Sequence, residues 1–447
     1  MLAEPASQTA EVRFDCPTRH GADCTRYAVQ GVAPSLVLLP ETEQAAAASL
    51  AVCNAHGLAV VPWGGGTLQA MGNAPARLDA VLSLERLDQI VNYEPSDLTI
   101  SVQAGVTLAT LQETLAAHGQ MLPFDLAAPE RATIGGAVAT NLVGPRRFGA
   151  GSYRDLLIGL TVAAPDGTIS KAGGMVVKNV SGYDMMKLHL GALGSLGLLL
   201  RLNFKVLTQP AFDTTATIGG AALRERAMAN DGTDGERTVL LELAATLASS
   251  QLAPDSLELF GPGAPQADDR GWRLAVRLTG SAQGIARKRS DLTALCTTAG
   301  LTPAWSDGEP MRAGWQRCAE FLSPASAPAD EALLRLAAPP AQLGALIEHL
   351  QTAARKANLD VRLAAHAGNG ILFARLSGSR LAVELPPLLT ALGTGWGNAT
   401  LLAAPAEVKQ GLDVWGPLPD GFTLMQRIEA EFDPQGTLNP GRFLGRL

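Results

Sequence analysis

Residues 60–67 read Val-Val-Pro-Trp-Gly-Gly-Gly-Thr, and this stretch constrains the fold more than any other part of the chain. Two β-branched residues end a predicted strand, and Pro62 cannot donate a further ladder hydrogen bond. The three glycines leave the backbone bare, so consecutive N–H groups can converge on an anion such as a phosphate. The stretch matches neither a Walker loop nor a Rossmann fingerprint. Taken alone, it also fits an ordinary tight turn.

A second glycine turn, at residues 132–136, lies about seventy residues further along. The segment before it, residues 121–129, contains two prolines and is predicted to be extended. A short helix is predicted to follow at 137–141. Since a helix start offers free N–H groups and a positive dipole end, the two turns could hold one phosphate-bearing ligand from both sides.

The length of 447 residues exceeds what one hydrophobic core usually supports, so we expect two domains. Residues up to Ala33 show few periodic apolar positions and are interpreted as an extension or a loosely attached arm. Hydrophobic periodicity then predicts alternating strands and helices. The predicted strands lie at 36–39, 58–62, 80–84, 90–92, 98–103, 156–164, 194–206, 272–278, 360–364 and 371–376, and the predicted helices at 42–56, 108–118 and 341–357.

Composition excludes several classes of protein. The net charge of −7 and the lack of a Lys/Arg block argue against nucleic acid as a partner. The five cysteines form no Cys-x-x-Cys pair, so they indicate neither a zinc site nor an iron–sulfur cluster. The start of the chain lacks a signal peptide pattern, and the most apolar segment, 188–200, is shorter than the ~20 residues that cross a bilayer. We therefore expect a cytoplasmic protein without a transmembrane segment.

Several long segments occur together in an order that resembles one known family. They are residues 90–123, residues 144–147 (Gly-Pro-Arg-Arg), residues 177–184 (Val-Lys-Asn-Val-Ser-Gly-Tyr-Asp) and the tail 432–442 (Phe-Asp-Pro-Gln-Gly-Thr-Leu-Asn-Pro-Gly-Arg). They resemble the FAD-binding subunits of bacterial glycolate oxidases, which are flavoproteins related to vanillyl-alcohol oxidase and to peptidoglycan-precursor reductase. The resemblance covers roughly residues 35–210 and the tail.

The resemblance implies an α+β fold: a two-part FAD-binding domain of the p-cresol methylhydroxylase (PCMH) type, interrupted by an α+β cap domain built on an antiparallel sheet with flanking helices. The implied boundaries are an N-terminal arm at 1–33, the FAD-binding domain at 34–210, the cap at 211–415 and a C-terminal return to the FAD-binding domain at 416–447.

The resemblance also implies which residues bind FAD. The first glycine turn and the second would hold the pyrophosphate, Gly197 and Leu199 would approach the adenine end or the flavin edge, and Asn439 would lie near the isoalloxazine. Relatives that attach FAD covalently often carry a histidine after the first glycine run, where this chain has Thr67, so we expect non-covalent FAD. The full set is Pro62, Trp63, Gly64, Gly65, Gly66, Thr67, Leu68, Pro129, Thr133, Ile134, Gly135, Gly136, Thr140, Asn141, Gly149, Gly197, Leu199 and Asn439.

The cap departs from the pattern of related 2-hydroxy-acid dehydrogenases. Those proteins carry a His-x-Gly-Asp-Gly-Asn-x-His segment and a later Glu-His, which gather a divalent metal and a base. This chain keeps His366 but has Phe373 at the second histidine, and Glu407 is followed by Val408. One imidazole and one distant carboxylate fall short of a catalytic metal site, so we expect no metal and assign no catalytic residue.

Three basic residues, Arg146, Arg147 and Lys178, are the strongest remaining polar candidates. On the family fold they flank the flavin, where a positive charge could stabilise reduced anionic FAD or bind a carboxylate. A solvated surface loop explains them equally well.

Three hypotheses for function follow from the resemblance. The first is a flavin subunit of a glycolate oxidase complex. Its partners would be a catalytic FAD- or metal-bearing subunit and an iron–sulfur subunit, and any contact with a membrane would be peripheral, through the complex. The second is a self-sufficient FAD-dependent dehydrogenase of 2-hydroxy acids such as D-lactate or glycolate. The third is an assembly scaffold that has lost its flavin, against which the intact glycine turns argue.

Overall fold

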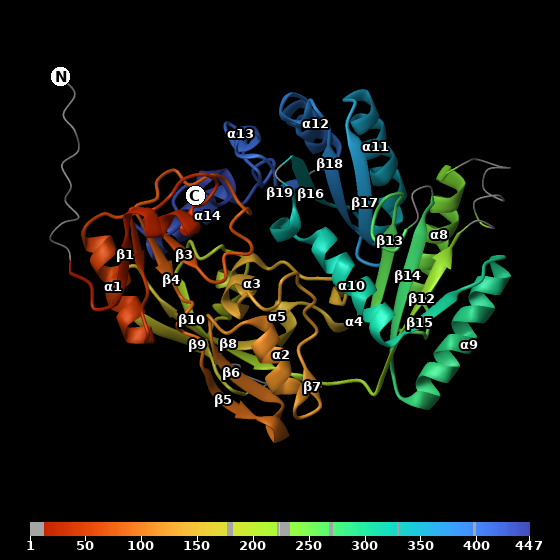
Figure 1. The fold of residues 1–447 in the computed structure, drawn as a ribbon, viewed down its shortest axis with the longest axis horizontal. Coiled ribbons are helices and arrows are strands. Elements are labelled where there is room, and N and C mark those ends of the chain that lie inside the picture. The colour runs from red at the N-terminus through yellow and green to blue at the C-terminus, as the bar shows by residue number, and fades with distance from the viewer. Residues whose placement is uncertain are drawn as a thin grey trace.

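The computed structural model describes residues 13–176, 182–220, 223, 233–267, 271–328, 330–396 and 399–447. In Figure 1 these residues form two bodies side by side, one built from the N-terminal half and the C-terminal tail, the other from the middle of the chain. No helix among the described residues has both the length and the apolar character needed to cross a membrane.

The first helix follows its local sequence signals. Helix α1 (Glu43–Ala55) begins after Thr42, whose side chain accepts a hydrogen bond from the N–H of Ala45 at 3.0 Å. It ends before Gly57, which has a φ of +62°. The helix predicted at 42–56 is therefore confirmed, to within a residue at each end.

The first body contains a four-stranded sheet with the order β1-β2-β4-β3. Strands β2 (Leu36–Leu38) and β3 (Val60–Trp63) both pair in parallel with β4 (Ala80–Ser83), because the connection between β2 and β3 runs through α1. The strand predicted at 36–39, the one at 58–62 and the one at 80–84 are confirmed.

The expectation of a loosely attached arm is wrong for part of residues 1–33. Strand β1 (Thr18–His20) pairs with β2 in antiparallel register, and the 3-10 helix η2 (Gly21–Tyr27) follows it. Cys24 and Tyr27 are buried in a cluster with Val37 and Val61 of the sheet. These contacts join residues far apart in sequence, so local periodicity did not reveal them.

An antiparallel five-stranded sheet completes the first body, together with the small pair β7 (Gln120–Met121) and β11 (Leu207–Thr208). Helix α2 (Leu108–Ala116) starts after the predicted N-cap Thr107. Helix α3 (Ile134–Thr140) begins inside the second glycine turn, three residues before the start predicted for it at 137. The short helices α4 (Arg147–Ala150), α5 (Tyr153–Leu156) and α6 (Met186–His189) lie in the connections. The strands, in sheet order, are β5 (Ile90–Glu94), β6 (Thr99–Gln103), β10 (Leu198–Lys205), β8 (Leu157–Ala163) and β9 (Ile169–Gly173).

The second body is one eight-stranded antiparallel sheet with helices, as the cap was expected to be. Its helices are α8 (Thr233–Ala248), α9 (Ala282–Thr298), α10 (Gly308–Leu322), α11 (Leu343–Lys356) and α12 (Leu381–Trp396). The sheet order is β15 (Ala304–Asp307), β12 (Phe212–Gly219), β14 (Arg273–Gly280), β13 (Ser256–Phe260), β17 (Asp360–His366), β18 (Ile371–Ser377), β16 (Glu331–Ala337) and β19 (Thr400–Ala403).

The two faces of this cap sheet belong to two different cores. Along β18, Ile371 and Phe373 pack in the core shared with the first body, whereas Leu372 and Ala374 pack with the cap helices. Because side chains alternate along a strand, the first set points towards the FAD-binding body. We call that side of the cap sheet the inward face.

The tail returns to the first body after the cap. Helix α13 (Ala406–Lys409) and helix α14 (Phe422–Phe432) follow β19, and the chain end lies beside the red N-terminal strands in Figure 1. The N–H of Val60 donates to Thr437 O at 2.7 Å, and the N–H of Asn439 donates to Val60 O at 2.8 Å. The tail thus extends the sheet beside β3, at the strand that leads into the first glycine turn.

Candidate functional site

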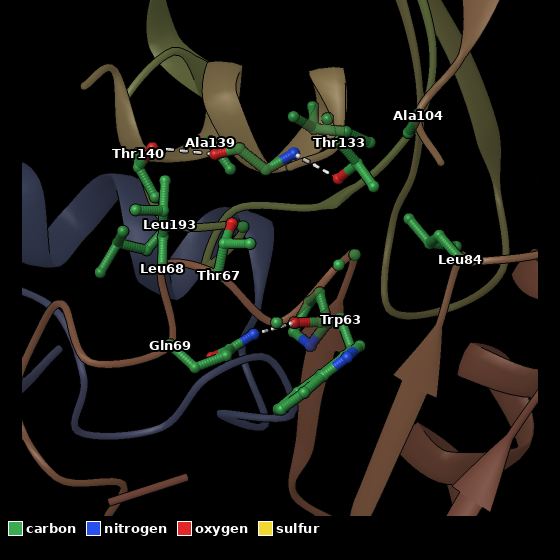
Figure 2. Close-up of a pocket in the computed structure, with 18 of the residues that line it drawn as sticks. Trp63, Thr67, Leu68, Gln69, Leu84, Ala104, Thr133, Ala139, Thr140 and Leu193 are labelled. Atoms are coloured by element: carbon green, nitrogen blue, oxygen red, sulfur yellow. Dashed lines mark hydrogen bonds between the residues drawn. The ribbon is translucent and has the colours of Figure 1, made fainter. Parts of the chain in front are cut away.

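A narrow pocket lies between the two glycine turns and the tail. In Figure 2, Trp63, Thr67 and Gln69 of the first turn face Thr133, Ala139 and Thr140 of the α3 region across this space. Thirteen of the predicted site residues line it, namely Pro62, Trp63, Gly64, Gly65, Gly66, Thr67, Leu68, Thr133, Gly135, Gly136, Thr140, Leu199 and, from the tail, Asn439.

The first turn offers hydrogen-bond donors with no protein acceptor. No described residue accepts a hydrogen bond from the backbone N–H groups of residues 64–67. Glycine is required here for steric reasons: a Cβ on Gly65 would lie 1.6 Å from Arg131 O, and Gly66, with φ of +70°, packs on the Trp63 indole. Four consecutive free donors on a bare backbone suit an anionic group such as a diphosphate.

The second turn differs from the expectation of free N–H groups. The N–H of Ile134 donates to Val106 O and that of Gly135 to Ala104 O, both at 2.9 Å. The N–H of Gly136 donates to the Thr133 hydroxyl at 3.3 Å, as the dashed line in Figure 2 shows. The start of α3 therefore contributes a close-packed wall, because its first backbone N–H groups already donate to the loop between β6 and α2 and to the N-cap side chain.

The remaining predicted residues lie around the pocket without lining it. Ile134 is fully buried, and Asn141 ends α3 with φ of +51°. Pro129 borders a separate, larger cavity between the two bodies. A Cβ on Gly197 would lie 2.5 Å from the Val162 side chain, and Gly149 packs against Asp255 of the cap, to which its N–H donates a hydrogen bond at 3.1 Å.

The pocket also has lining residues that the sequence analysis did not single out. Apart from Arg442, they are mostly apolar or small, and nothing in their local sequence marks them. They are Gln69, Leu84, Ala104, Ala139, Leu193, Gly194, Leu198 and Arg442.

Arg442 brings a buried positive charge to the pocket wall. Only 4% of its surface is exposed. Its guanidinium donates to Gln69 Oε1 at 2.7 Å, Gln69 O at 2.8 Å and Met71 O at 2.7 Å, while its Nε has no partner among the described residues. Burial lowers the pKa of Arg442 to about 10, so the side chain remains a cation at neutral pH. The tail sequence contains this arginine, but only the tertiary fold reveals its contact with the glycine loop.

A histidine–carboxylate pair lies on the inward face of the cap sheet. His366 Nδ1 and Glu258 Oε1 are 2.7 Å apart, and both side chains are buried. Phe373 lies edge-on to the imidazole, with 5.2 Å between the ring centroids. Burial raises the pKa of Glu258. His366 Nε2 and Glu258 Oε2 have no hydrogen-bond partner among the described residues.

The three basic candidates differ in where they lie in the structure. Arg146 lies at the junction of the two bodies, 3.4 Å from Asp125 and 3.7 Å from Asp213. Arg147 begins the short helix α4 and is partly exposed. Lys178 lies outside the described residues. Within the described part of the chain, no three His, Cys, Asp or Glu side chains gather closely enough to hold a metal ion.

Comparisons with known proteins indicate FAD as the cofactor of this chain. Residues 34–173 match the family described as "FAD binding domain", and residues 418–443 match "FAD linked oxidases, C-terminal domain". The two matches bracket the cap and contain both glycine turns and the tail. The residues fit this cofactor: the free N–H groups and Arg442 suit its diphosphate, and the leucine side chains suit its rings.

Similar curated proteins span much of the chain. Glycolate oxidase subunit GlcD of Bacillus subtilis is 25% identical over 92% of this chain and 89% of its own length. Mitochondrial D-2-hydroxyglutarate dehydrogenase of Rattus norvegicus is 26% identical over 92% of this chain and 78% of its own length. Glycolate oxidase subunit GlcE of Escherichia coli is 44% identical, but over only 27% of this chain and 35% of its own length.

Solved structures confirm the expected fold. p-Cresol methylhydroxylase with substrate bound superposes with a TM-score of 0.70 at 15% identity, over 92% of this chain and 88% of that one. The α+β architecture expected from the sequence, a PCMH-type FAD-binding domain with a cap, is confirmed by this match. Fold and family matches agree: the chain contains an FAD-binding domain and an FAD-linked oxidase C-terminal segment, carried on a PCMH-type fold.

Proposed function

We propose that this chain is the FAD-binding subunit of a glycolate oxidase complex, which takes part in the oxidation of glycolate to glyoxylate and passes electrons through FAD to partner subunits. The proposed partners are a catalytic FAD- or metal-bearing subunit and an iron–sulfur subunit. The proposed location is the cytoplasm, with any membrane contact made through the complex. The likeness to GlcE and to GlcD supports this assignment.

Bound FAD supplies the two-electron acceptor in such a reaction. The chain's own residues hold and shield it. The free N–H groups of residues 64–67 would bind the diphosphate, with Arg442 supplying positive charge in the same wall. Leu68, Leu193 and Leu199 would exclude water from the pocket. We propose that the attachment is non-covalent, because Thr67 offers no imidazole for a bond to the flavin.

The observation that carries the need for a partner is the presence of two apolar residues, Phe373 on the inward face and Val408 on helix α13. Oxidation of a 2-hydroxy acid requires a base that accepts the hydroxyl proton. Phe373 and Val408, both buried, stand where the related dehydrogenases have histidines, and His366 is engaged with Glu258. A chain with this set of side chains would bind flavin and depend on another subunit for the proton transfer.

The first test is a visible spectrum of the purified chain, followed by anaerobic addition of glycolate. We expect the absorption band of oxidised flavin to be present and to persist after glycolate is added. Bleaching of the band by the isolated chain would contradict the need for a partner subunit. A folded but colourless protein would favour the scaffold hypothesis. Flavin that stays with the denatured polypeptide in mass spectrometry would contradict non-covalent attachment.

A self-sufficient 2-hydroxy-acid dehydrogenase is the second candidate, and the His366–Glu258 pair favours it. When the Glu258 carboxylate accepts a hydrogen bond from Nδ1–H of His366, the lone pair on Nε2 can act as a base, and Nε2 has no hydrogen-bond partner among the described residues. This candidate requires that glycolate or D-lactate bleaches the flavin of the wild-type chain, and that His366→Gln abolishes the bleaching while retaining the flavin band.

A further inference from the structure

Two cationic side chains cover the loop that follows the first glycine turn. Four consecutive carbonyl oxygens, those of residues 69–72, accept hydrogen bonds from them in alternation. Arg442 Nη2 donates to Gln69 O at 2.8 Å and to Met71 O at 2.7 Å. Lys409 Nζ donates to Ala70 O, and to Gly72 O at 3.3 Å. One short loop therefore joins the end of α13 to the tail.

Both cations are buried without an acidic partner. Lys409 is 2% exposed and Arg442 is 4% exposed. Within the described ranges, no carboxylate lies at ion-pair distance from either side chain. A buried charge normally has a counter-charge, because removing an unpaired ion from water is costly. Two such cations on one loop point to an anion supplied from outside the chain.

The acidic groups around Lys409 are engaged elsewhere or exposed. Asp413, in the next loop, accepts hydrogen bonds from Asn73 Nδ2 at 3.2 Å and from the N–H of Gly445 at 2.6 Å. Glu407, on the same short helix, is exposed. Glu331, across the neighbouring hollow, pairs with Arg362 and Arg375. The remaining charge facing Lys409 is Arg442, which is repulsive.

We propose that Lys409 is a charge-compensating residue of the FAD site, which takes up a proton from solvent when FAD binds. Without flavin, the ammonium form is disfavoured by burial and by Arg442. Arg442 lines the pocket and donates to the same loop as Lys409, so the negative charge of a bound FAD diphosphate would favour the ammonium form of Lys409. The proposal concerns cofactor binding alone and does not depend on which substrate the protein oxidises.

The direction of the pH dependence follows from linkage. Burial and the Arg442 charge lower the pKa of Lys409 to about 7 in the flavin-free structure. Bound FAD would raise this pKa. Between the two values the complex holds one proton more than the free chain, so the FAD dissociation constant rises with pH, by up to about tenfold per pH unit. Below pH 7, Lys409 is protonated with and without FAD, so it no longer makes the FAD dissociation constant depend on pH.

The test is calorimetric titration of FAD into the flavin-free full-length chain, at several pH values and in buffers with different ionisation enthalpies. We expect proton uptake approaching one per FAD above pH 7. Lys409→Met and Lys409→Arg should both abolish the uptake and the pH dependence of affinity, the first because the charge is absent and the second because it is permanent. Lys409→Arg keeps the donors to the loop, so it serves if Lys409→Met does not fold.

Lys288→Met is the matched control. Lys288 also donates to two carbonyl oxygens, Thr279 O at 3.1 Å and Ala253 O at 3.3 Å, but it lies in the cap, away from the pocket. We expect this variant to take up protons like the wild type. Wild-type binding without proton uptake between pH 7 and pH 9, or undiminished uptake in Lys409→Arg, would overturn the proposal. A purely structural role for Lys409 would alter affinity equally at every pH.

Discussion

At the scale of single residues, Gly65 controls how closely the two glycine turns approach each other. A Cβ at this position would lie 1.6 Å from Arg131 O, a backbone atom that cannot rotate away. We expect Gly65→Ala to force the turns apart at a cost of about 1–3 kcal/mol and to weaken FAD binding about tenfold. The measurement is the ratio of flavin to protein absorbance after gel filtration.

Gly174→Ala is the matched control for that experiment. Gly174 lies in the same body, and an added Cβ would meet no atom within 4 Å. This variant should keep the wild-type flavin content. Equal flavin content in Gly65→Ala would show that the close contact between the two turns does not shape the pocket.

The His366–Glu258 pair makes a second prediction at this scale. His366→Leu would leave the Glu258 carboxylate, which has no exposed surface, without its partner. We expect a loss of about 3–5 kcal/mol in the free energy of unfolding, because a buried charge is then uncompensated. Replacing both residues with leucine should recover most of the loss. Urea unfolding of the two variants measures the difference, and a double variant as unstable as the single one would contradict this account.

At the scale of elements, Tyr27 links the N-terminal residues to the cofactor loop. Its ring is 1% exposed and packs edge-on to Trp63 at 5.2 Å, and Trp63 in turn supports Gly66. We expect Tyr27→Ala to lower stability by about 3–5 kcal/mol, as for other large aromatic truncations, and to lower the temperature at which flavin fluorescence appears. Tyr27→Phe keeps the ring and should behave like the wild type. A normal flavin-release temperature in Tyr27→Ala would mean that η2 does not support the loop.

Elements with local signals were predictable from sequence, and elements defined by distant contacts were not. Thr42 and Thr107 mark the starts of α1 and α2, because an N-cap hydrogen bond lies within four residues of chain. β1 has three residues, and it is a strand only because it pairs with β2. Local sequence has no means of showing that partner.

The candidate site shows the same limit. The glycine run predicted the loop with free N–H groups, because glycine content determines backbone access. The sequence could not show that the donors at the start of α3 are used by Ala104 O and Val106 O. Nor could it show that Lys409 and Arg442 meet at residues 69–72, since both contacts span more than three hundred residues of chain.

At the scale of the whole molecule, an ion-pair network joins the two bodies. Arg277 of the cap donates two hydrogen bonds to Asp213, at 3.0 and 2.6 Å, and lies 3.7 Å from Asp125 of the FAD-binding body. Arg146 reaches the same two carboxylates from the first body. The network lines the large cavity between the bodies, so it helps to determine how the cap sits over the first body.

Arg277→Met should therefore weaken the coupling between the bodies. The change leaves two carboxylates facing one arginine, and because Arg277 is only 4% exposed, we expect a loss of about 3 kcal/mol. Scanning calorimetry should then resolve two unfolding transitions in place of one, with the cap melting first. Arg312→Met is the control: Arg312 is 63% exposed and pairs with Glu309 on its own helix, so its loss should change little. A single, unshifted transition in Arg277→Met would show that apolar contacts between the inward face and the first body suffice to hold the cap in place.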